Sequence, residues 1–424
     1  MSLSTIILFM LALIALNMRL YLAIIAATLC YFLVIAPLPI GIAVQRLVGP
    51  TQNASLLAIP FFILLGTLMA HTGIAERMLK IADLLVGRVR GGMALANVML
   101  STLMGGLSAS NLADAAMTAR MMVPEMEKRG YDRAFSSALT AASSLITPII
   151  PPGIALIIYA LLANVSVGRM FMAGILPGLL LAAILMLTTY IVSVRRGYKP
   201  SRQTAPSAQE VGSTLFGSWP AIFLVIAVIG GIRANIFTPT EAGAFAVLFV
   251  IFVGFIVSRE MRLSHVGDAL LETGKSTASI MLVIMASSAL AWVFSLEQVG
   301  QQLASVITAT TSNPWIFLLI MNGVFLGLGL LIEGTALMIV LVPILLPTVL
   351  ELGIDPIHFG IVMIVNLSIG TMTPPVGTVM LVVCNITRVS VGAFTREATS
   401  LYIALLVALL MVTFVPAISL ALAG

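Results

Sequence analysis

Charged residues are scarce in this chain of 424 residues, since Asp, Glu, Lys and Arg together make up only 9% of it. An average globular protein has about 25%. Hydrophobic residues make up 60%, and the mean hydropathy is +1.15. A soluble chain of this length keeps a polar shell around its core and cannot bury so much apolar surface. The composition therefore predicts an all-α polytopic membrane protein.

Cysteine and histidine are also rare. Cys30 and Cys384 lie far apart in apolar runs, which excludes a disulfide framework and a cysteine-rich metal site. The three histidines lack the spacing of zinc ligands. Residues 274–276 resemble the end of a P-loop, but Ala269 stands where that loop requires glycine. We expect neither an enzyme nor an ATP-driven protein, and no nucleic-acid partner, because the basic residues cluster between apolar runs.

Apolar runs long enough to cross a bilayer recur along the chain. A hydrocarbon core about 30 Å thick needs about 20 apolar residues per helix. The first run is expected to be a true span and not a cleaved leader. Two of the predicted spans, 133–164 and 356–387, are long and interrupted. The predicted crossings are 4–16, 21–36, 56–71, 133–164, 174–194, 219–236, 241–258, 276–296, 356–387 and 398–423.

Two more apolar stretches, 91–126 and 314–350, are broken near their middles by small and polar residues. We interpret each as a re-entrant hairpin; the alternative is a pair of ordinary spans joined by a short turn. If the hairpins do not cross, the positive-inside rule places every basic cluster in the cytoplasm and both termini outside. Amphipathic arms, 75–90 and 299–311, precede the hairpins. The basic clusters are 77–90, 128–133, 195–202 and 259–262.

An internal repeat relates the two halves. Pro124 aligns with Pro347, an offset of 347 − 124 = 223, and the register holds until Pro151-Pro152 meets Pro374-Pro375. Shared hydrophobicity does not explain matching Gly, Pro and Asp residues. With five spans and one hairpin per copy, the second copy must be inverted, which is typical of secondary transporters. The predicted units are residues 1–195, a mobile cytoplasmic linker at 196–213, and residues 214–424.

Each copy combines a polar hairpin tip with a proline-containing break in a span. The tips are 108–111 and 332–335, and the breaks are 147–153 and 370–377. Inside hydrocarbon every peptide group needs a partner, and proline leaves carbonyl groups free. Free carbonyls and hydroxyls suit sodium, while half-helix N-termini suit a carboxylate. We predict one cation site per copy; the alternative is that the breaks are simple helix kinks.

Several isolated polar residues are further candidates for the functional site, and their roles have alternative interpretations. Glu333 at the second tip either stabilises the tip or a cation, or reaches water. Asp114 and Arg120 either pair with each other or meet an anionic substrate. Three further residues, of which the last two are repeat equivalents, could line a pocket: Asn111, Ser143 and Asn366.

An ordered set of motifs resembles the large membrane subunit of the tripartite ATP-independent periplasmic (TRAP) transporters, nearly end to end. The resemblance implies an elevator-type secondary transporter, similar in fold to the ion transporter superfamily, in the bacterial inner membrane. It implies sodium-driven import of an organic acid, a separate small four-helix membrane subunit, and a periplasmic substrate-binding protein. The motifs are IPFFILLG at 59–66, SASNLADAA at 108–116, VPEMEKRGYD at 123–132, IPPG at 150–153, ILPG at 175–178, FTPTEA at 237–242 and TPPVG at 373–377.

The resemblance also implies ligands for sodium. The first sodium site would use Ser108, Ser110, Thr147, Ile150 and Pro152. The second would use Glu333, Gly334, Thr335, Gly370, Thr373 and Pro375. Candidate substrate ligands are Ser110, Asn111, Ser143, Asn366 and Arg120.

The chain departs from the family pattern at three of these positions. The first tip often reads Ser-Gly-Ser-Ser, but this chain has Ala109 and Asn111, and Thr147 replaces a usual glycine. These departures lie at the first tip and the first break, where the resemblance implies the first sodium site. Two other functions remain as alternatives: a stand-alone ion-coupled anion carrier and a non-transporting membrane scaffold. The solute itself cannot be read from the sequence.

Overall fold

The computed structural model describes residues 3–16, 18–35, 38–107, 110–299, 301–302, 305, 313–330 and 332–424, and this part of the chain is helical without strands. The first half contains α1 (Leu3–Ala15), α2 (Leu20–Cys30), the π-helix η1 (Tyr31–Ile35), α3 (Ile40–Val48), the 3-10 turns η2 (Gly49–Gln52) and η3 (Ala54–Leu57), α4 (Ala58–Met69), α5 (Ile74–Val86), α6 (Gly92–Gly105), α7 (Asn111–Lys128), α8 (Arg133–Ser144), α9 (Ile154–Leu162) and α10 (Val167–Arg195).

The second half is also helical in its described residues. It contains α11 (Ala208–Gly217), α12 (Trp219–Arg233), α13 (Pro239–Phe252), the π-helix η4 (Val253–Val257), α14 (Leu263–Leu296), α16 (Pro314–Gly329), α17 (Gly334–Glu351), α18 (Pro356–Met372), α19 (Thr378–Thr387), α20 (Val391–Phe414) and α21 (Ala417–Leu420). The predicted arm at 299–311 falls almost wholly outside the described residues.

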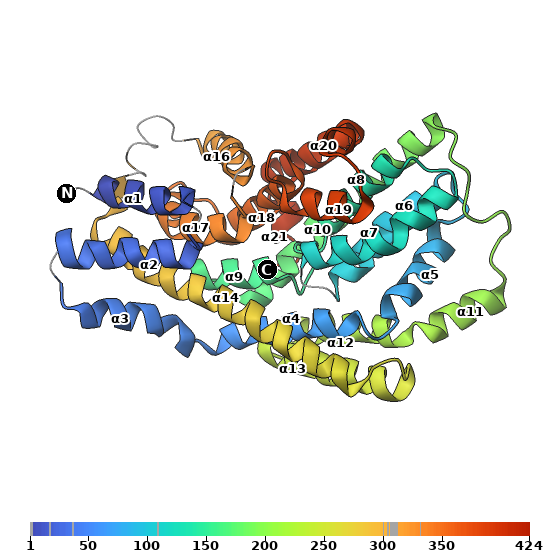
Figure 1. Cartoon of the computed structure of the whole chain (residues 1–424), viewed down its shortest axis with the longest axis horizontal. Coiled ribbons are helices and arrows are strands. Elements are labelled where there is room, and N and C mark those ends of the chain that lie inside the picture. Colours follow the sequence, from blue (N-terminus) through green and yellow to red (C-terminus); the bar gives the residue numbers. More distant parts are fainter. Residues whose placement is uncertain are drawn as a thin grey trace.

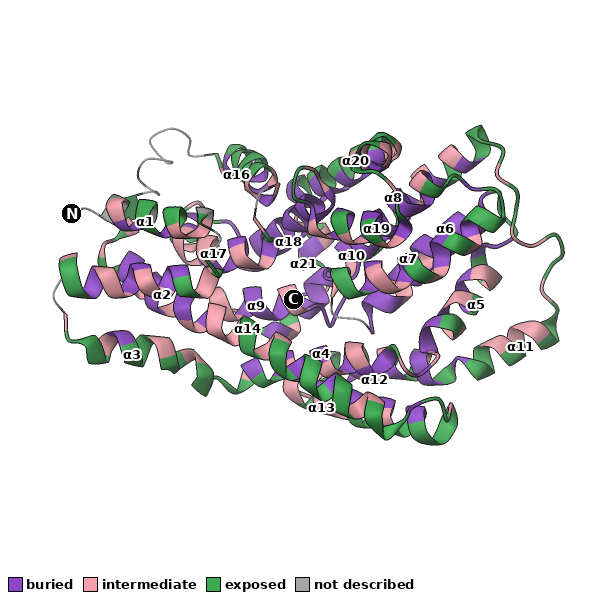
Figure 2. Cartoon of the chain, in the orientation of Figure 1, coloured by how far each residue is buried: buried purple, intermediate pink, exposed green. Residues whose placement is uncertain are grey.

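Several helices have the length and hydropathy of membrane spans. Among the described residues there are 5 such helices, or up to 7 if two pairs bent by 59° each form one span. The sequence predicts ten crossings. Some of these, such as 133–164 and 356–387, are divided in the structure into two shorter helices, and each of those helices is too short to count as a span by itself. Large apolar side chains such as Leu8, Ile226 and Leu248 are more than 60% exposed on the outer helices. Figure 2 shows this exposed surface surrounding a buried centre, as expected for a protein whose solvent is lipid.

The two predicted breaks both separate helices. α8 ends at Ser144 and α9 begins at Ile154, while α18 ends at Met372 and α19 begins at Thr378. Both segments contain a cis Pro-Pro bond, Pro151-Pro152 and Pro374-Pro375. The helices before the breaks also begin alike, because an aspartate side chain caps each N-terminus: Asp132 accepts from Phe135 N–H at 2.8 Å and Asp355 from Ile357 N–H at 2.7 Å.

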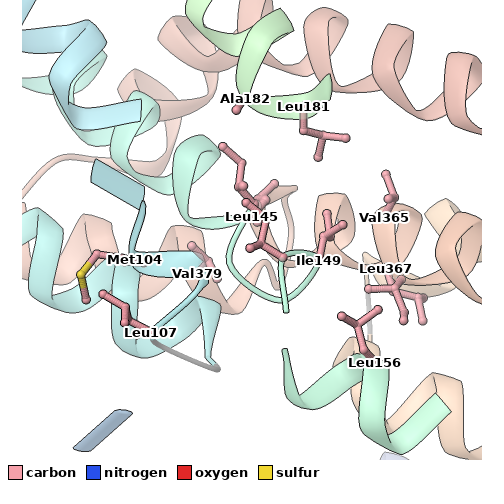
Figure 3. Close-up of a cluster of buried hydrophobic side chains, with 14 of the residues drawn as sticks. Met104, Leu107, Leu145, Ile149, Leu156, Leu181, Ala182, Val365, Leu367 and Val379 are labelled. Atoms are coloured by element: carbon pink, nitrogen blue, oxygen red, sulfur yellow. The ribbon is translucent and has the colours of Figure 1, made fainter. Parts of the chain in front are cut away.

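Two apolar clusters divide the helices. One joins α1, α2 and α3 to the second half of α14, with side chains from Ile6 to Phe294. The other contains the two predicted hairpin segments, both broken helices, and also α4, α12 and α13. Figure 1 shows α14 running obliquely across the bundle, with α1 to α3 at one end and α5 and α11 at the opposite end. Side chains that pack the breaks into the larger cluster appear in Figure 3: Met104, Leu107, Leu145, Ile149, Leu156, Leu181, Ala182, Val365, Leu367 and Val379.

The linker at 196–213 is more ordered than its composition predicts. Ser207 caps α11, which begins inside this segment, by accepting from the Glu210 N–H at 3.1 Å. Arg202 Nε donates to Asp83 Oδ2 of α5 at 2.8 Å, and Arg202 also pairs with Glu210. The Ser201 hydroxyl donates to Asp83 as well. Polar side chains that suggested mobility therefore form specific contacts with α5.

Replacing Asp83 with alanine should loosen this linker without unfolding the protein. A partly exposed ion pair contributes about 0 to 1 kcal/mol, so trypsin cleavage after Arg202 should become about threefold faster, while the melting temperature stays nearly unchanged. Asp268→Ala, which removes an exposed acid on α14, is the matched control and should leave the cleavage rate unaltered. Equal rates for both variants would contradict a linker held by Asp83.

Candidate functional site

The first hairpin tip contacts the second broken helix. Ser110 is the N-cap of α7, and its hydroxyl accepts from the Ala113 N–H at 3.4 Å. Asn111 follows at the first position of α7, and its Nδ2 donates to Thr371 Oγ1 near the end of α18 at 3.3 Å. Ser108 lies outside the described residues. The first tip is thus positioned by a residue from the other half of the chain.

The first break lies beside the returning arm of the same hairpin. Thr147 is wholly buried, and its hydroxyl donates to Asp114 Oδ2 of α7 at 3.2 Å. Ile150 and Pro152 are also buried, and a Cβ added at Gly105 would lie 3.0 Å from Ile150 Cβ. The structure therefore brings Thr147 to α7 and Ile150 to α6, and Ser110 lies at the start of α7.

The second tip is arranged differently. Glu333 is the N-cap of α17, and its carboxylate accepts from the Thr335 and Ala336 N–H groups at 3.0 and 2.9 Å. This contact uses the carboxylate to satisfy the helix N-terminus, where a negative charge is favourable. Glu333 therefore caps α17, and its side chain also lines a cavity.

Close backbone packing joins the second hairpin to the second break. A Cβ added at Gly370 would lie 2.9 Å from the Gly329 carbonyl oxygen, and one added at Gly334 would lie 3.1 Å from Leu367 Cβ. The Val376 N–H donates to the Leu330 carbonyl at 3.3 Å. Thr373 and Pro375 belong to this break, and the Thr373 hydroxyl donates to the Ile369 carbonyl at 2.8 Å. The predicted ligands of the second site therefore come from segments in contact.

Three candidate substrate ligands lie away from the tips. Ser143 is buried and shares a hydrogen bond of 3.2 Å with Ser101 of α6. Asn366 is buried too, and its Nδ2 donates to Asn322 Oδ1 of α16 at 2.9 Å. Both placements favour helix packing over contact with a solute. Arg120 is exposed on α7, and among the described residues it forms no ion pair with Asp114, because Asp114 faces Thr118 and Thr147 instead.

A cavity of about 570 Å³ lies between the two tips. It is lined at the N-termini of four helices, since Asn111 begins α7, Ile154 begins α9, Thr335 lies in the first turn of α17 and Thr378 begins α19. An adjoining cavity of about 50 Å³ shares Asn111, Glu333 and Thr371 with it. Cavities of about 470 to 560 Å³ elsewhere contain no described tip residue. Helix N-termini carry partial positive charge, so this cavity favours an anion.

The cavity also contains residues that sequence reasoning did not select. Arg19 and Tyr21, at the start of α2, and Ser279 of α14 line it opposite the hairpins. Their only sequence signal is polarity within or beside an apolar run. Their proximity to Ser110 or Glu333 depends on tertiary packing.

The comparison with protein families identifies the class of protein to which this chain belongs. Residues 5–418 match the family described as tripartite ATP-independent periplasmic transporter, DctM component. The chain belongs to the DctM family. It is therefore a component of a three-part TRAP transporter, a multi-pass membrane protein and not an enzyme.

Curated DctM relatives align over most of their lengths. The chain is 40% identical over 377 residues to the C4-dicarboxylate TRAP transporter large permease protein DctM of Pseudomonas aeruginosa, covering 89% of this chain and 88% of that protein. It is 38% identical to the sialic acid TRAP transporter large permease protein SiaM of Vibrio cholerae, with 89% and 88% covered. It is 33% identical to the 2,3-diketo-L-gulonate TRAP transporter large permease protein YiaN of Escherichia coli, again with 89% and 88% covered.

A solved structure shares the DctM fold at low sequence identity. The Alcanivorax borkumensis YdaH transporter, described as having an unusual topology, superposes with a TM-score of 0.65 at 15% identity, and 88% of each chain is covered. This likeness concerns the fold alone.

Proposed function

We propose that this DctM-family subunit imports a small organic acid together with sodium, and that the acid binds in the cavity between the two hairpin tips. The observation that carries the proposal is the convergence of the N-termini of α7, α9 and α19 on one cavity, beside that of α17, which Glu333 caps. Their partial positive charges stabilise a carboxylate without requiring a buried basic residue. The relatives' names, which include a dicarboxylate, a sialic acid and a keto sugar acid, support the same class of solute.

The surroundings of Asp114 support a cation site at the first break. This carboxylate is 1% exposed and accepts hydrogen bonds from neighbouring hydroxyl groups, among them those of Thr118 and Thr147. Among the described residues no lysine or arginine forms an ion pair with it. A buried carboxylate is costly without a counter-charge. Sodium bound by the tip and the break would supply that charge, with Asp114 acting through Thr147.

We further propose that the hairpins and broken helices move as one unit relative to α1–α4 and α12–α14, as in an elevator. The separate apolar cluster of α1, α2, α3 and α14 supports this division for those four helices, whereas α4, α12 and α13 share the larger cluster with the hairpins and would have to slide along it. An inverted repeat accounts for the paired tips and paired breaks, and the positive-inside rule places both termini in the periplasm. The remaining components of the transporter would be a small four-helix membrane subunit and a periplasmic binding protein that delivers the acid.

Uptake into proteoliposomes tests this function. The subunit would be reconstituted with its small membrane partner and its binding protein, and supplied with radiolabelled succinate, N-acetylneuraminate or 2,3-diketo-L-gulonate. We expect uptake of at least one acid that requires an inward sodium gradient and the binding protein. Uptake that persists unchanged when potassium replaces sodium would overturn the coupling. Equal uptake without the binding protein would instead favour a stand-alone carrier.

A further inference from the structure

Arg19 is the only basic residue among the described residues that line the tip cavity. The cavity has one acid, Glu333, whose two carboxylate oxygens already accept backbone N–H groups of α17. The charge of Glu333 therefore lies against the positive end of α17, and no ion pair within the described ranges joins this carboxylate to Arg19, so Arg19 and the N-termini of α7, α9 and α19 together leave the wall positive. This balance favours a negatively charged occupant.

The position of Arg19 is fixed by the start of α2. Its carbonyl oxygen accepts from the N–H groups of Leu22 and Ala23 at 2.9 and 3.1 Å, as expected at a helix N-cap. One guanidinium nitrogen, Nη1, donates to the Tyr21 hydroxyl at 3.3 Å, and Tyr21 lines the same cavity. None of the ion pairs in the described part of the chain involves Arg19. The remaining N–H donors of the guanidinium are thus available to a carboxylate.

Arg19 also belongs to a different packing unit from the tips. α2 packs against α1 and α14, and their side chains form the apolar cluster that excludes the tips and both breaks. The N-termini of α7, α9, α17 and α19 come from the hairpins and broken helices. A solute in the cavity would therefore have the N-termini of the hairpins and broken helices on one side. On its other side it would have the Arg19 side chain, which belongs to the packing unit of α1, α2 and α14.

We infer that Arg19 is an anion-recruiting residue, which attracts the carboxylate of the transported acid into the tip cavity from the scaffold side. The inference rests on the proposed function, because it names a second group that recognises the same acid. Since Arg19 stays with α2 when the hairpins move, it would act only while the cavity faces it. It would raise the local concentration of anions in the cavity without travelling with them.

Cysteine labelling measures this effect without a transported solute. Ser279 lines the cavity from α14 and is exposed, so Ser279→Cys should react with both anionic sulfonatoethyl and cationic trimethylammonium-ethyl methanethiosulfonate. Reaction would be followed on the full complex in membrane vesicles, and the chain without the added cysteine gives the background from Cys30 and Cys384. The ratio of the anionic to the cationic reaction rate reports the local potential.

Adding Arg19→Gln should lower that ratio about fivefold, and Arg19→Lys should restore it, because only the charge matters. Arg88→Gln removes an exposed arginine that lies outside every cavity described above, and it should leave the ratio unchanged. The same ratio in Arg19→Gln and Arg88→Gln would overturn the inference. So would a Ser279→Cys chain that reacts with neither reagent, because the cavity would then be closed to anions. A failure of sodium-driven uptake would not change these rates, so the two proposals fail separately.

Discussion

Replacing Gly370 with alanine is expected to reduce sodium-driven uptake at least about tenfold, although the change adds one methyl group. The new Cβ would lie 2.9 to 3.0 Å from three backbone atoms of Gly329. Backbone cannot rotate away as a side chain can, so α16 and α18 must separate. Overpacking of this kind costs about 1 to 3 kcal/mol, and it would displace the second tip from the second break, where small shifts are costly for binding.

Gly323→Ala provides a matched control on α16. A Cβ added at Gly323 meets no atom within 4 Å, and the residue is exposed. Alanine is favoured over glycine in a helix by about 0.5 to 1 kcal/mol, so this variant should keep full uptake and melt at an equal or slightly higher temperature. Uptake and thermal unfolding would be measured for both variants. Wild-type uptake by Gly370→Ala would show that the close contact is unimportant for transport.

Replacing Asp114 with asparagine is expected to weaken sodium activation of uptake about 10- to 100-fold. The substitution keeps the size of the side chain but removes its negative charge and weakens the hydrogen bonds from Thr118 and Thr147. Hydrogen bonds to a charged group are worth about 1.5 to 3 kcal/mol, which corresponds to this range. The measurement is the sodium concentration that gives half-maximal uptake in proteoliposomes.

Glu125→Gln is the control for this charge change. Glu125 lies on the same helix but pairs with Arg129 and Lys128 near the end of α7, where its side chain is 38% exposed. Its replacement should leave the sodium dependence unaltered. If Asp114→Asn and Glu125→Gln have the same sodium requirement as the unchanged chain, the buried carboxylate does not contribute to a cation site.

The family and the helical membrane class could be predicted from sequence because they depend on local signals. Apolar runs, proline pairs and short motifs each occupy a few neighbouring residues. The positions of Pro151 and Pro374 marked the two segments where the helices are in fact interrupted. The sequence also drew attention to Asp114 and Glu333, since acids are rare in apolar surroundings.

Partners distant in the chain could not be predicted in this way. Asp114 meets Thr147, 33 residues further on, instead of Arg120 on its own helix. Arg120 was a candidate substrate ligand because it is basic. Its position on the exposed face of α7 depends on how the whole hairpin packs. Ser143 and Asn366 occupy equivalent positions in the predicted repeat. Both form hydrogen bonds to a neighbouring helix. Helix packing can therefore explain why both positions are polar, without any contact to a solute.

The hydrogen bond from Asn111 to Thr371 has a consequence for the timing of transport. It joins the beginning of α7 to α18, so the first tip cannot open without losing a contact with the opposite half. If each half binds a sodium ion, as proposed above, the departure of one ion loosens the binding site of the other. Sodium efflux from the two halves would then be cooperative, and the protein would avoid leaking a single ion when no acid accompanies it.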